Sequence, residues 1–400
     1  NATVVTQTTV IKRITEKYLA KLIRAQLKQE EVPSLPEGVT VDEIVQIAKK
    51  HHLNYLLLGA LIRVDNLTEE ERSRLRSPLM NSILRCGVQV QEQRELERLF
   101  EEKGIINQPM KGAVLRFYYP APQMREMSDL DILFAEQNMG EAQELLKERG
   151  YTLYRAVKHH DIFQKPPFLV IEAHRAMYDK TVDRNQYGYF KNFSRTHTRN
   201  GCTYTQDFGT EDFYVYMMAH AAKHFYQTGC GIRHLIDIYV YLERFGEQMD
   251  RNYLDKELEQ CGILTFTGHM EKLAYLWLEE EESNALYDNL FAYLLDSGIY
   301  GKDENGIWNK FAEEKKKGKT AGRQQLKFWY AFPPLHYMAE YYPYLEDCPW
   351  LLPWAWLVRG ITGLAKHKGT YKRQMMNHID EERIRTVQDI YEKMDLKFQS

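Results

Sequence analysis

The sequence predicts an α+β fold in which a small mixed β-sheet lies between an N-terminal and a C-terminal helical region. Apolar side chains recur at helical spacing near both ends of the chain, whereas several short central segments have the pattern of strands. The chain of 400 residues is also long enough for two or three packed units. We therefore expect a helical region over residues 1–103, an α/β core over 104–209 and a helical region over 210–400.

The N-terminal region is predicted to be helical. Its first segment places apolar residues such as Ile14 and Tyr18 at a period of about 3.6 residues. Its last helix begins after Thr68, because "TEEE" combines a capping hydroxyl with acids in the first turn. The predicted helices span residues 9–30, 41–51, 54–64 and 68–103, the last with a break near Pro78.

The central region changes to strands separated by turns. The segment "SDLDILF" alternates polar and apolar residues, which is typical of a strand with one buried face. Lys111-Gly112 lies between a short strand and a short helix, and therefore forms a turn. The predicted strands span residues 105–110, 128–134, 151–157, 159–165 and 168–174, and the predicted helices span 113–119 and 140–149.

The C-terminal region returns to helices at Thr210, a capping residue that two acids follow. A second helix over residues 232–245 follows a glycine-rich turn, and further helices are expected to about Leu294. Residues 300–324 are rich in Lys, Glu and Gly, so we expect an exposed loop or linker there. The aromatic tail from Gln325 is predicted to be helical.

Composition and charge argue against several classes of protein. The net charge is -3 and no basic stripe interleaved with aromatic residues is present, so nucleic acid is not the expected partner. The five cysteines form no C-x-x-C pair, which argues against a disulfide framework and favours a reducing cytoplasm. No membrane span is predicted, since the most apolar stretch, residues 349–361, is short and favours a buried or interfacial helix.

The strongest local signal is the pair formed by Asp129 and Asp131. On a strand, their side chains point to the same side, about 6–7 Å apart. Two carboxylates this close repel each other, unless cations bind between them or solvent surrounds them. Mg²⁺ prefers carboxylate oxygens together with substrate phosphates. The pair therefore predicts a metal–nucleotide site, and two surface acids at a strand end are the alternative.

Residues that precede this pair have the chemistry to bind phosphate. At the turn of Lys111 and Gly112, backbone amides and the positive end of a helix can hold a phosphate, and the lysine adds a point charge. Arg125 precedes the acids by four residues and can donate two hydrogen bonds to one phosphate. The alternative for Arg125 is a surface arginine or one that neutralises an acid.

The stretch "MKGAVLRFYYPAPQMREMSDLDILF", residues 110–134, resembles the signature of an uncharacterised nucleotidyltransferase family. That signature combines K-G-x-x-L, a Tyr-Pro loop and R-x-M-x-D-h-D, in which h is apolar. The family belongs to the DNA polymerase β-like superfamily, in which a strand-end D-h-D pair binds metal and a neighbouring strand supplies a third carboxylate. The wider superfamily usually carries Gly-Gly or Gly-Ser where this chain has Lys111-Gly112.

The resemblance implies that the sheet is a nucleotidyltransferase core, and it covers about residues 80–245. The segment "LVIEAHR" resembles the later strand, which makes Glu172 the third carboxylate. The segment "EDFYVYMMAHAAKHFYQTGCGIRHLIDI" resembles the helical part of the family. The implied catalytic residues and metal ligands are Asp129, Asp131 and Glu172; the implied nucleotide contacts are Lys111, Gly112, Arg125, Ser128, Lys223 and His224; and the possible substrate contacts are His174, His220, Arg233 and Asp237.

Two histidine patterns suggest other chemistry. His220 and His224 share a helix face, and H-x-x-x-H can bind zinc, but the glutamate of H-E-x-x-H is absent. Polar residues that face the site, or satisfied interior histidines, are therefore expected there. The "HHD" segment at residues 159–161 suggests a phosphohydrolase, but the sequence shows no suitable partner cluster, so no site is expected at this segment.

The resemblance implies transfer of a nucleoside monophosphate from an NTP to a hydroxyl of a small molecule or protein, with Mg²⁺ or Mn²⁺ as cofactor. One alternative is a catalytically inactive protein that keeps the fold for nucleotide binding or scaffolding. Two others are a metal-dependent phosphohydrolase and a structural helical adaptor. The nucleotide, the acceptor and the oligomeric state are left open.

Overall fold

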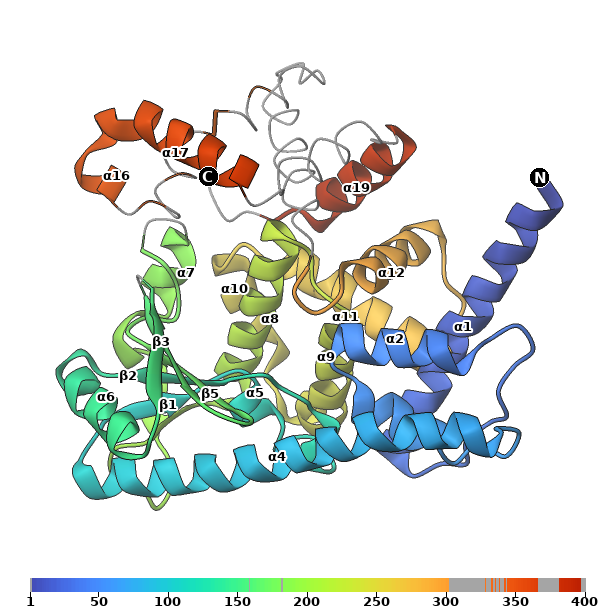
Figure 1. The fold of residues 1–400 in the computed structure, drawn as a ribbon, viewed down its shortest axis with the longest axis horizontal. Helices are drawn as coiled ribbons and strands as arrows, with labels where there is room; N and C mark the ends of the chain where they lie inside the picture. The colour runs from blue at the N-terminus through green and yellow to red at the C-terminus, as the bar shows by residue number, and fades with distance from the viewer. Residues whose placement is uncertain are drawn as a thin grey trace. The chain divides into compact units, whose positions relative to one another are not determined.

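The structure, a computed structural model, describes residues 2–157, 159–180, 183–301, 328, 332–333, 335, 338, 342, 344–365 and 381–396. The chain divides into two compact units. The larger comprises residues 1–225, 229–301 and 395–400, and the smaller comprises 226–228 and 302–394. A five-stranded mixed sheet and a two-stranded sheet, flanked by helices, confirm the predicted α+β class (Figure 1). The predicted boundaries between the three regions, at residues 103 and 209, stay a prediction.

The N-terminal part of the larger unit is helical, as expected. Its last helix has a capping box, in which the Thr68 hydroxyl accepts from the Glu71 amide and the Glu71 carboxylate accepts from the Thr68 amide. This helix continues through Pro78, so the predicted break is wrong. One missing hydrogen bond does not end a helix that is capped at both ends, here by Thr68 and by left-handed Gly104. The elements are α1 (Ala2–Lys28), α2 (Val41–His51), the π-turn η1 (Asn54–Leu58), α3 (Gly59–Leu61) and α4 (Glu69–Lys103).

The central sheet contains the five predicted strands, each shorter at its ends than expected. Their order is β1-β2-β5-β4-β3; β2 and β5 run parallel, and the other neighbours run antiparallel. The strands are β1 (Asn107–Pro109), β2 (Leu130–Phe134), β3 (Thr152–Ala156), β4 (His160–Lys165) and β5 (Leu169–His174), with helices α5 (Gly112–Leu115) and α6 (Met139–Glu148) between them. A second sheet, β6 (Thr196–Thr198) with β7 (Gln206–Phe208), was not predicted, because neither segment shows an alternation of polar and apolar residues.

Strand alternation divides the two faces of the central sheet by polarity. One face of β2 and β5 is apolar and packs against α4 and α6 (Figure 1). The rings of Phe100 on α4 and Phe134 on β2 meet edge to face with centroids 5.2 Å apart. Side chains of this size contribute about 1.5–3 kcal/mol each when fully buried. The opposite face of the same strands carries Asp131, Glu172 and His174.

Helix α8 connects this sheet to the C-terminal helices. Tyr216 on α8 packs its ring against Phe208 with centroids 5.4 Å apart, and its hydroxyl contacts Met110 Sδ at 3.7 Å. This packing brings α8 to the turn that carries Lys111. The remaining α-helices of the larger unit are α7 (Arg184–Tyr189), α8 (Thr210–Gln227, as far as Phe225), α9 (Arg233–Phe245), α10 (Arg251–Gln260), α11 (Leu264–Leu278) and α12 (Ala285–Ser297).

The smaller unit has a small core of its own, in which Met338, Leu345 and Ala355 are buried. A buried or interfacial helix was expected over residues 349–361. Trp350 and Trp354 are 73% and 59% exposed, so burial is wrong for these two side chains. None of the described helices is long and apolar enough to cross a membrane. The predicted linker lies outside the described residues, apart from residues 300 and 301. The described elements are α16 (Tyr344–Asp347), η6 (Pro349–Leu351), α17 (Leu352–Ala365) and α19 (Glu381–Met394).

Candidate active site

The structure brings the predicted carboxylates together on the polar face of the sheet. The parallel pairing of β2 with β5 aligns Asp131 directly with Glu172. Ligand atoms of Asp131, Glu172 and His174 all lie within 4.8 Å of one another. Asp129 stands immediately before β2, two residues from Asp131, and accepts a hydrogen bond of 3.4 Å from the Ser128 hydroxyl. The arrangement concentrates three carboxylates at the start of β2 and beside it on β5.

Lys111 reaches this group from the turn between β1 and α5. The Met110 amide donates to the Asp131 carbonyl at 3.0 Å, which fixes the start of the turn. Lys111 follows with a φ of 51° and a ψ of -124°, a conformation that residues with a side chain rarely adopt and that costs about 1–3 kcal/mol. Its ammonium lies 2.6 Å from Asp131 Oδ1. The strained turn therefore places a cation on the most buried carboxylate of the group.

Close packing at the same turn favours glycine at position 112. A Cβ atom at this position would lie 3.1 Å from Met127 Sδ and 3.4 Å from Arg125 Nη1. The first distance is shorter than ordinary contacts between such atoms, so a side chain would displace its neighbours. The glycine lets the start of α5 approach Arg125 closely.

His174 contacts two of the carboxylates. Its Nε2 lies 2.8 Å from Asp131 Oδ1 and 3.3 Å from Glu172 Oε2. The His174 side chain is 5% exposed, so these contacts are largely shielded from water. Asp131 is thus held by both His174 and Lys111, which places His174 among the carboxylates rather than in the apolar core.

The charges of this group shift its pKa values in opposite directions. Burial, together with the charges of Asp131 and Glu172, raises the pKa of Asp129 to about 7. Burial would also raise the pKa of Asp131, but the Lys111 ammonium and the His174 hydrogen bond outweigh it and hold that pKa below its ordinary value. Burial would lower the pKa of His174, and its hydrogen bonds to Asp131 and Glu172 raise it instead. The site is short of positive charge at Asp129.

Arg125 is bound to Asp237 in a buried ion pair. Its Nε donates to Asp237 Oδ1 at 2.7 Å and its Nη2 to Asp237 Oδ2 at 3.0 Å, while Nη1 donates to the Glu126 carbonyl. Tyr119, which the sequence did not single out, donates its hydroxyl to Asp237 at 2.6 Å. Arg233 donates to the same Glu126 carbonyl at 3.0 Å. These residues form a network beside the Gly112 turn.

The predicted contact residues on α8 are His220, Lys223 and His224, and each of them contacts another side chain of the protein. The Lys223 ammonium lies 2.9 Å from Asp183 Oδ2. The Nε2 atoms of His220 and His224 are 3.1 Å apart, and burial lowers the pKa of both, that of His224 to about 3. Both rings are therefore neutral at pH 7.

Comparison with known proteins shows the family of the chain. A family model described as an uncharacterised nucleotidyltransferase matches residues 37–279, more than half of the chain. The chain belongs to this family. The matched range contains the whole five-stranded sheet, and Lys111, Asp129, Asp131, Glu172 and His174 with it. No curated protein and no solved structure matches the chain.

One expectation is wrong, namely that the "HHD" segment lacks a partner cluster. The antiparallel register of β4 with β5 aligns His160 with His174. His160 Nε2 lies 3.8 Å from Glu172 Oε1, and its ring stacks on His174 with centroids 4.9 Å apart. Ligand atoms of His159, His160 and His174 lie within 4.8 Å of one another. Only strand pairing reveals this cluster, because the segments are separate in the sequence.

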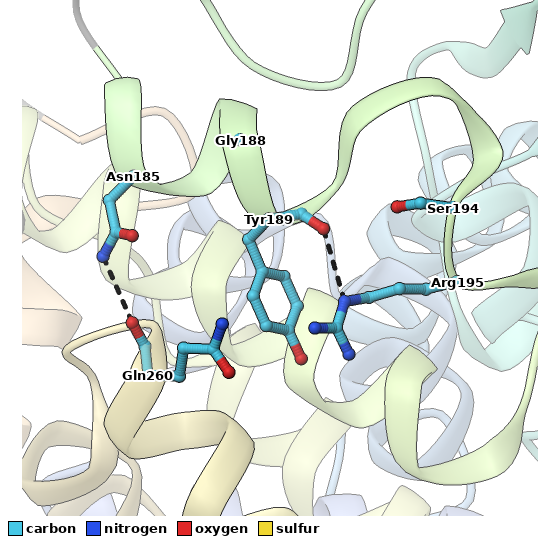
Figure 2. Close-up of a pocket in the computed structure, with 6 residues that line it drawn as sticks. All are labelled: Asn185, Gly188, Tyr189, Ser194, Arg195 and Gln260. Carbon is cyan, nitrogen blue, oxygen red and sulfur yellow. Dashed lines mark hydrogen bonds between the residues drawn. The ribbon is translucent and has the colours of Figure 1, made fainter.

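A polar pocket of about 580 Å³ lies elsewhere in the larger unit, between α7 and α10 (Figure 2). Asn185 donates to the Gln260 carbonyl at 3.3 Å across it. Arg195 lies 3.6 Å over the ring of Tyr189 and ion-pairs with Glu257 at 2.7 Å. The guanidinium is thus already neutralised, and the pocket is lined by none of the site carboxylates.

Proposed function

We propose that this chain transfers a nucleoside monophosphate from an NTP to a hydroxyl of a small molecule or protein, with Mg²⁺ or Mn²⁺ as cofactor. The observation that carries the proposal is the convergence of Asp131, Glu172 and His174 beside Asp129, in a chain of the nucleotidyltransferase family. The D-h-D pair at the start of β2 favours the DNA polymerase β-like superfamily. A hydroxyl outside nucleic acid is the proposed acceptor, since the chain has a net charge of -3 and lacks a basic stripe.

The donor atoms fit a hard divalent cation. Carboxylate oxygens of Asp129, Asp131 and Glu172 are the ligand type that Mg²⁺ and Mn²⁺ prefer. Burial and the neighbouring acids raise the pKa of Asp129, as expected where a carboxylate lacks a cation. When bound, the metal orients the triphosphate and lowers the pKa of the acceptor hydroxyl.

The side chains of the protein have separate proposed roles. Lys111 neutralises Asp131 in the structure. With a metal ion bound to that carboxylate, the Lys111 ammonium would instead neutralise charge on a phosphate. Glu172 completes the ligand set or accepts the proton of the acceptor hydroxyl. His174 is a positioning residue, because it binds both Asp131 and Glu172. The other proposed contacts to nucleotide or acceptor are Gly112, Arg125, Ser128, His220, Lys223, His224, Arg233 and Asp237.

Thermal unfolding with ATP, GTP, CTP or UTP, each with and without Mg²⁺, tests this proposal. A ligand that binds only the folded state stabilises it by about 2.7 kcal/mol at a hundred times its Kd. We expect at least one nucleotide to raise the Tm by several degrees only when Mg²⁺ is present. Asp131→Asn should lose this response, because it removes a carboxylate from the metal site.

The matched control is Asp65→Asn, which neutralises an exposed aspartate in a turn and should keep the response. The metal-free Tm of each variant shows whether it folds. If no nucleotide shifts the Tm of the wild type, or if Asp131→Asn responds as the wild type does, the metal–nucleotide site is not at these carboxylates.

A further inference from the structure

Three imidazoles meet beside the carboxylates. His159 and His160 stand at the start of β4, and His174 stands at the end of β5, where the register aligns it with His160. The ring centroids of His159 and His160 are 4.6 Å apart, and those of His160 and His174 are 4.9 Å apart. One nitrogen from each ring can be chosen so that all three lie within 4.8 Å of one another. Such a group has the composition of a metal site.

Two of these rings hold a buried nitrogen that has no hydrogen-bond partner in the described part of the chain. His174 turns Nε2 toward Asp131, and its Nδ1 is buried and unpartnered. His160 turns Nε2 toward Glu172, and its Nδ1 is likewise buried and unpartnered. A buried polar atom without a partner costs free energy, so both nitrogens favour a ligand that completes them.

The contacts of His174 match the surroundings of a metal-binding histidine. Such a histidine usually donates its other ring N–H to a carboxylate, which orients the ring and raises the basicity of the ligating nitrogen. The 2.8 Å contact between His174 Nε2 and Asp131 Oδ1 supplies this carboxylate. His160 Nε2 lies 3.8 Å from Glu172 Oε1, within ion-pair range but too far for a hydrogen bond. Both rings therefore leave Nδ1 as the nitrogen for a cation.

We propose that His159, His160 and His174 bind a second divalent cation, of the nitrogen-preferring class that Zn²⁺ represents. Imidazole nitrogen suits Zn²⁺, whereas Mg²⁺ takes oxygen ligands. Bonds of about 2.0–2.1 Å place tetrahedral ligand atoms about 3.3 Å apart, so modest ring rotations close the site. Three protein ligands leave the fourth position open to water or to an oxygen of the substrate.

The site differs from the proposed Mg²⁺ site in its donors but shares an orienting residue. His174 contacts the carboxylates through one nitrogen and offers the other to the second cation. A cation at the histidines therefore fixes the ring that positions Asp131 and Glu172. The inference goes beyond nucleotide transfer and does not depend on it.

Co²⁺ is the probe, because it replaces Zn²⁺ and its visible absorption reports tetrahedral nitrogen coordination. Untagged full-length protein is freed of metal with a chelator and titrated with Co²⁺ in excess Mg²⁺. We expect one equivalent to give an intense visible band that one equivalent of Zn²⁺ removes. His159→Gln should weaken binding by more than the roughly 10- to 100-fold cost of losing an outer-shell partner.

Two matched variants locate the ion. His197→Gln removes an exposed histidine on β6, and Asp129→Asn removes a carboxylate that is not a ligand of this cation; both should keep the band. The proposal is overturned if no band forms, or if His159→Gln binds Co²⁺ as tightly as the wild type. It is also overturned if only Asp129→Asn loses the band, since the ion then lies at the carboxylates.

X-ray absorption at the zinc edge identifies the ligands of Zn²⁺ in the wild-type protein. This test does not depend on whether any variant folds. Outer-shell scattering from about three imidazole rings, with metal–nitrogen distances of about 2.0–2.1 Å, is expected. A shell dominated by carboxylate oxygen, or one with no more than one imidazole, would contradict the three-histidine site.

Discussion

Asp129→Asn is expected to stabilise the metal-free protein and, at the same time, to abolish its Mg²⁺-dependent response to nucleotide. Burial and the charges of Asp131 and Glu172 raise the pKa of Asp129 to about 7, so the ionised carboxylate is disfavoured in the folded state. Asparagine removes the charge with little change of shape. The same charge is needed to bind a cation, so stability and function should change in opposite directions.

The stabilisation should depend on pH with a defined sign. A carboxyl whose folded-state pKa is raised destabilises the fold once the pH exceeds its ordinary value of 3.8, and this penalty grows until about pH 7. The gain in unfolding free energy from Asp129→Asn should therefore be near zero at pH 4. Above pH 7 it should reach at most about 4 kcal/mol, since each unit of pKa corresponds to about 1.36 kcal/mol.

Urea unfolding at pH 4 and pH 8, in the presence of a chelator, measures this difference. Asp65→Asn is the control, because it removes an exposed aspartate and should change neither value by more than about 0.5 kcal/mol. A gain of equal size at both pH values, or a loss at pH 8, would show that the charge of Asp129 is not the cause.

Asp237→Asn is expected to destabilise the protein by about 3–5 kcal/mol, because it leaves a buried guanidinium without its counter-charge. The side chains of Arg125 and Asp237 are 7% and 3% exposed, and two hydrogen bonds join them. Tyr119 also loses a charged acceptor. Urea unfolding without nucleotide measures the loss separately from any role in binding.

A double variant distinguishes an ion pair from simple packing. Arg125→Met with Asp237→Leu removes both charges, and an apolar replacement of a buried pair is often neutral or stabilising. We expect the double variant to be more stable than Asp237→Asn alone. The single variants Arg125→Met and Asp237→Leu complete the comparison. If the double variant loses as much stability as the two single variants together, the two charges do not interact.

Strands and acidic pairs could be predicted because their signals are local. The alternation in "SDLDILF" is complete within seven residues, and it places Asp129 and Asp131 on one face without knowledge of any partner. The third acid, Glu172, came from the family resemblance, and its position opposite Asp131 became visible only in the pairing of β2 with β5.

Contacts between distant residues could not be predicted from these patterns. His160 faces His174 only because β4 turns back along β5, and a shift of one residue would point it to the opposite face. Arg125 and Asp237, 112 positions apart, were both predicted to face a ligand, and nothing in the sequence showed that they bind each other. The sequence shows that each residue is polar, but only the fold shows which residue it contacts.

The long helix α4 has a consequence for how the larger unit melts. Its 35 residues extend about 52 Å and contact η1. Figure 1 shows α4 running along the sheet. Leu75 is buried near its start, and Leu96 and Phe100 enter the core of the sheet. If either the N-terminal helices or the sheet unfolds, one end of α4 loses its packing while the other end is still buried. Unfolding of one part therefore destabilises the other. Calorimetry should therefore show one cooperative endotherm for the larger unit. Two resolved endotherms within it would mean that α4 does not couple the unfolding of the N-terminal helices to that of the sheet.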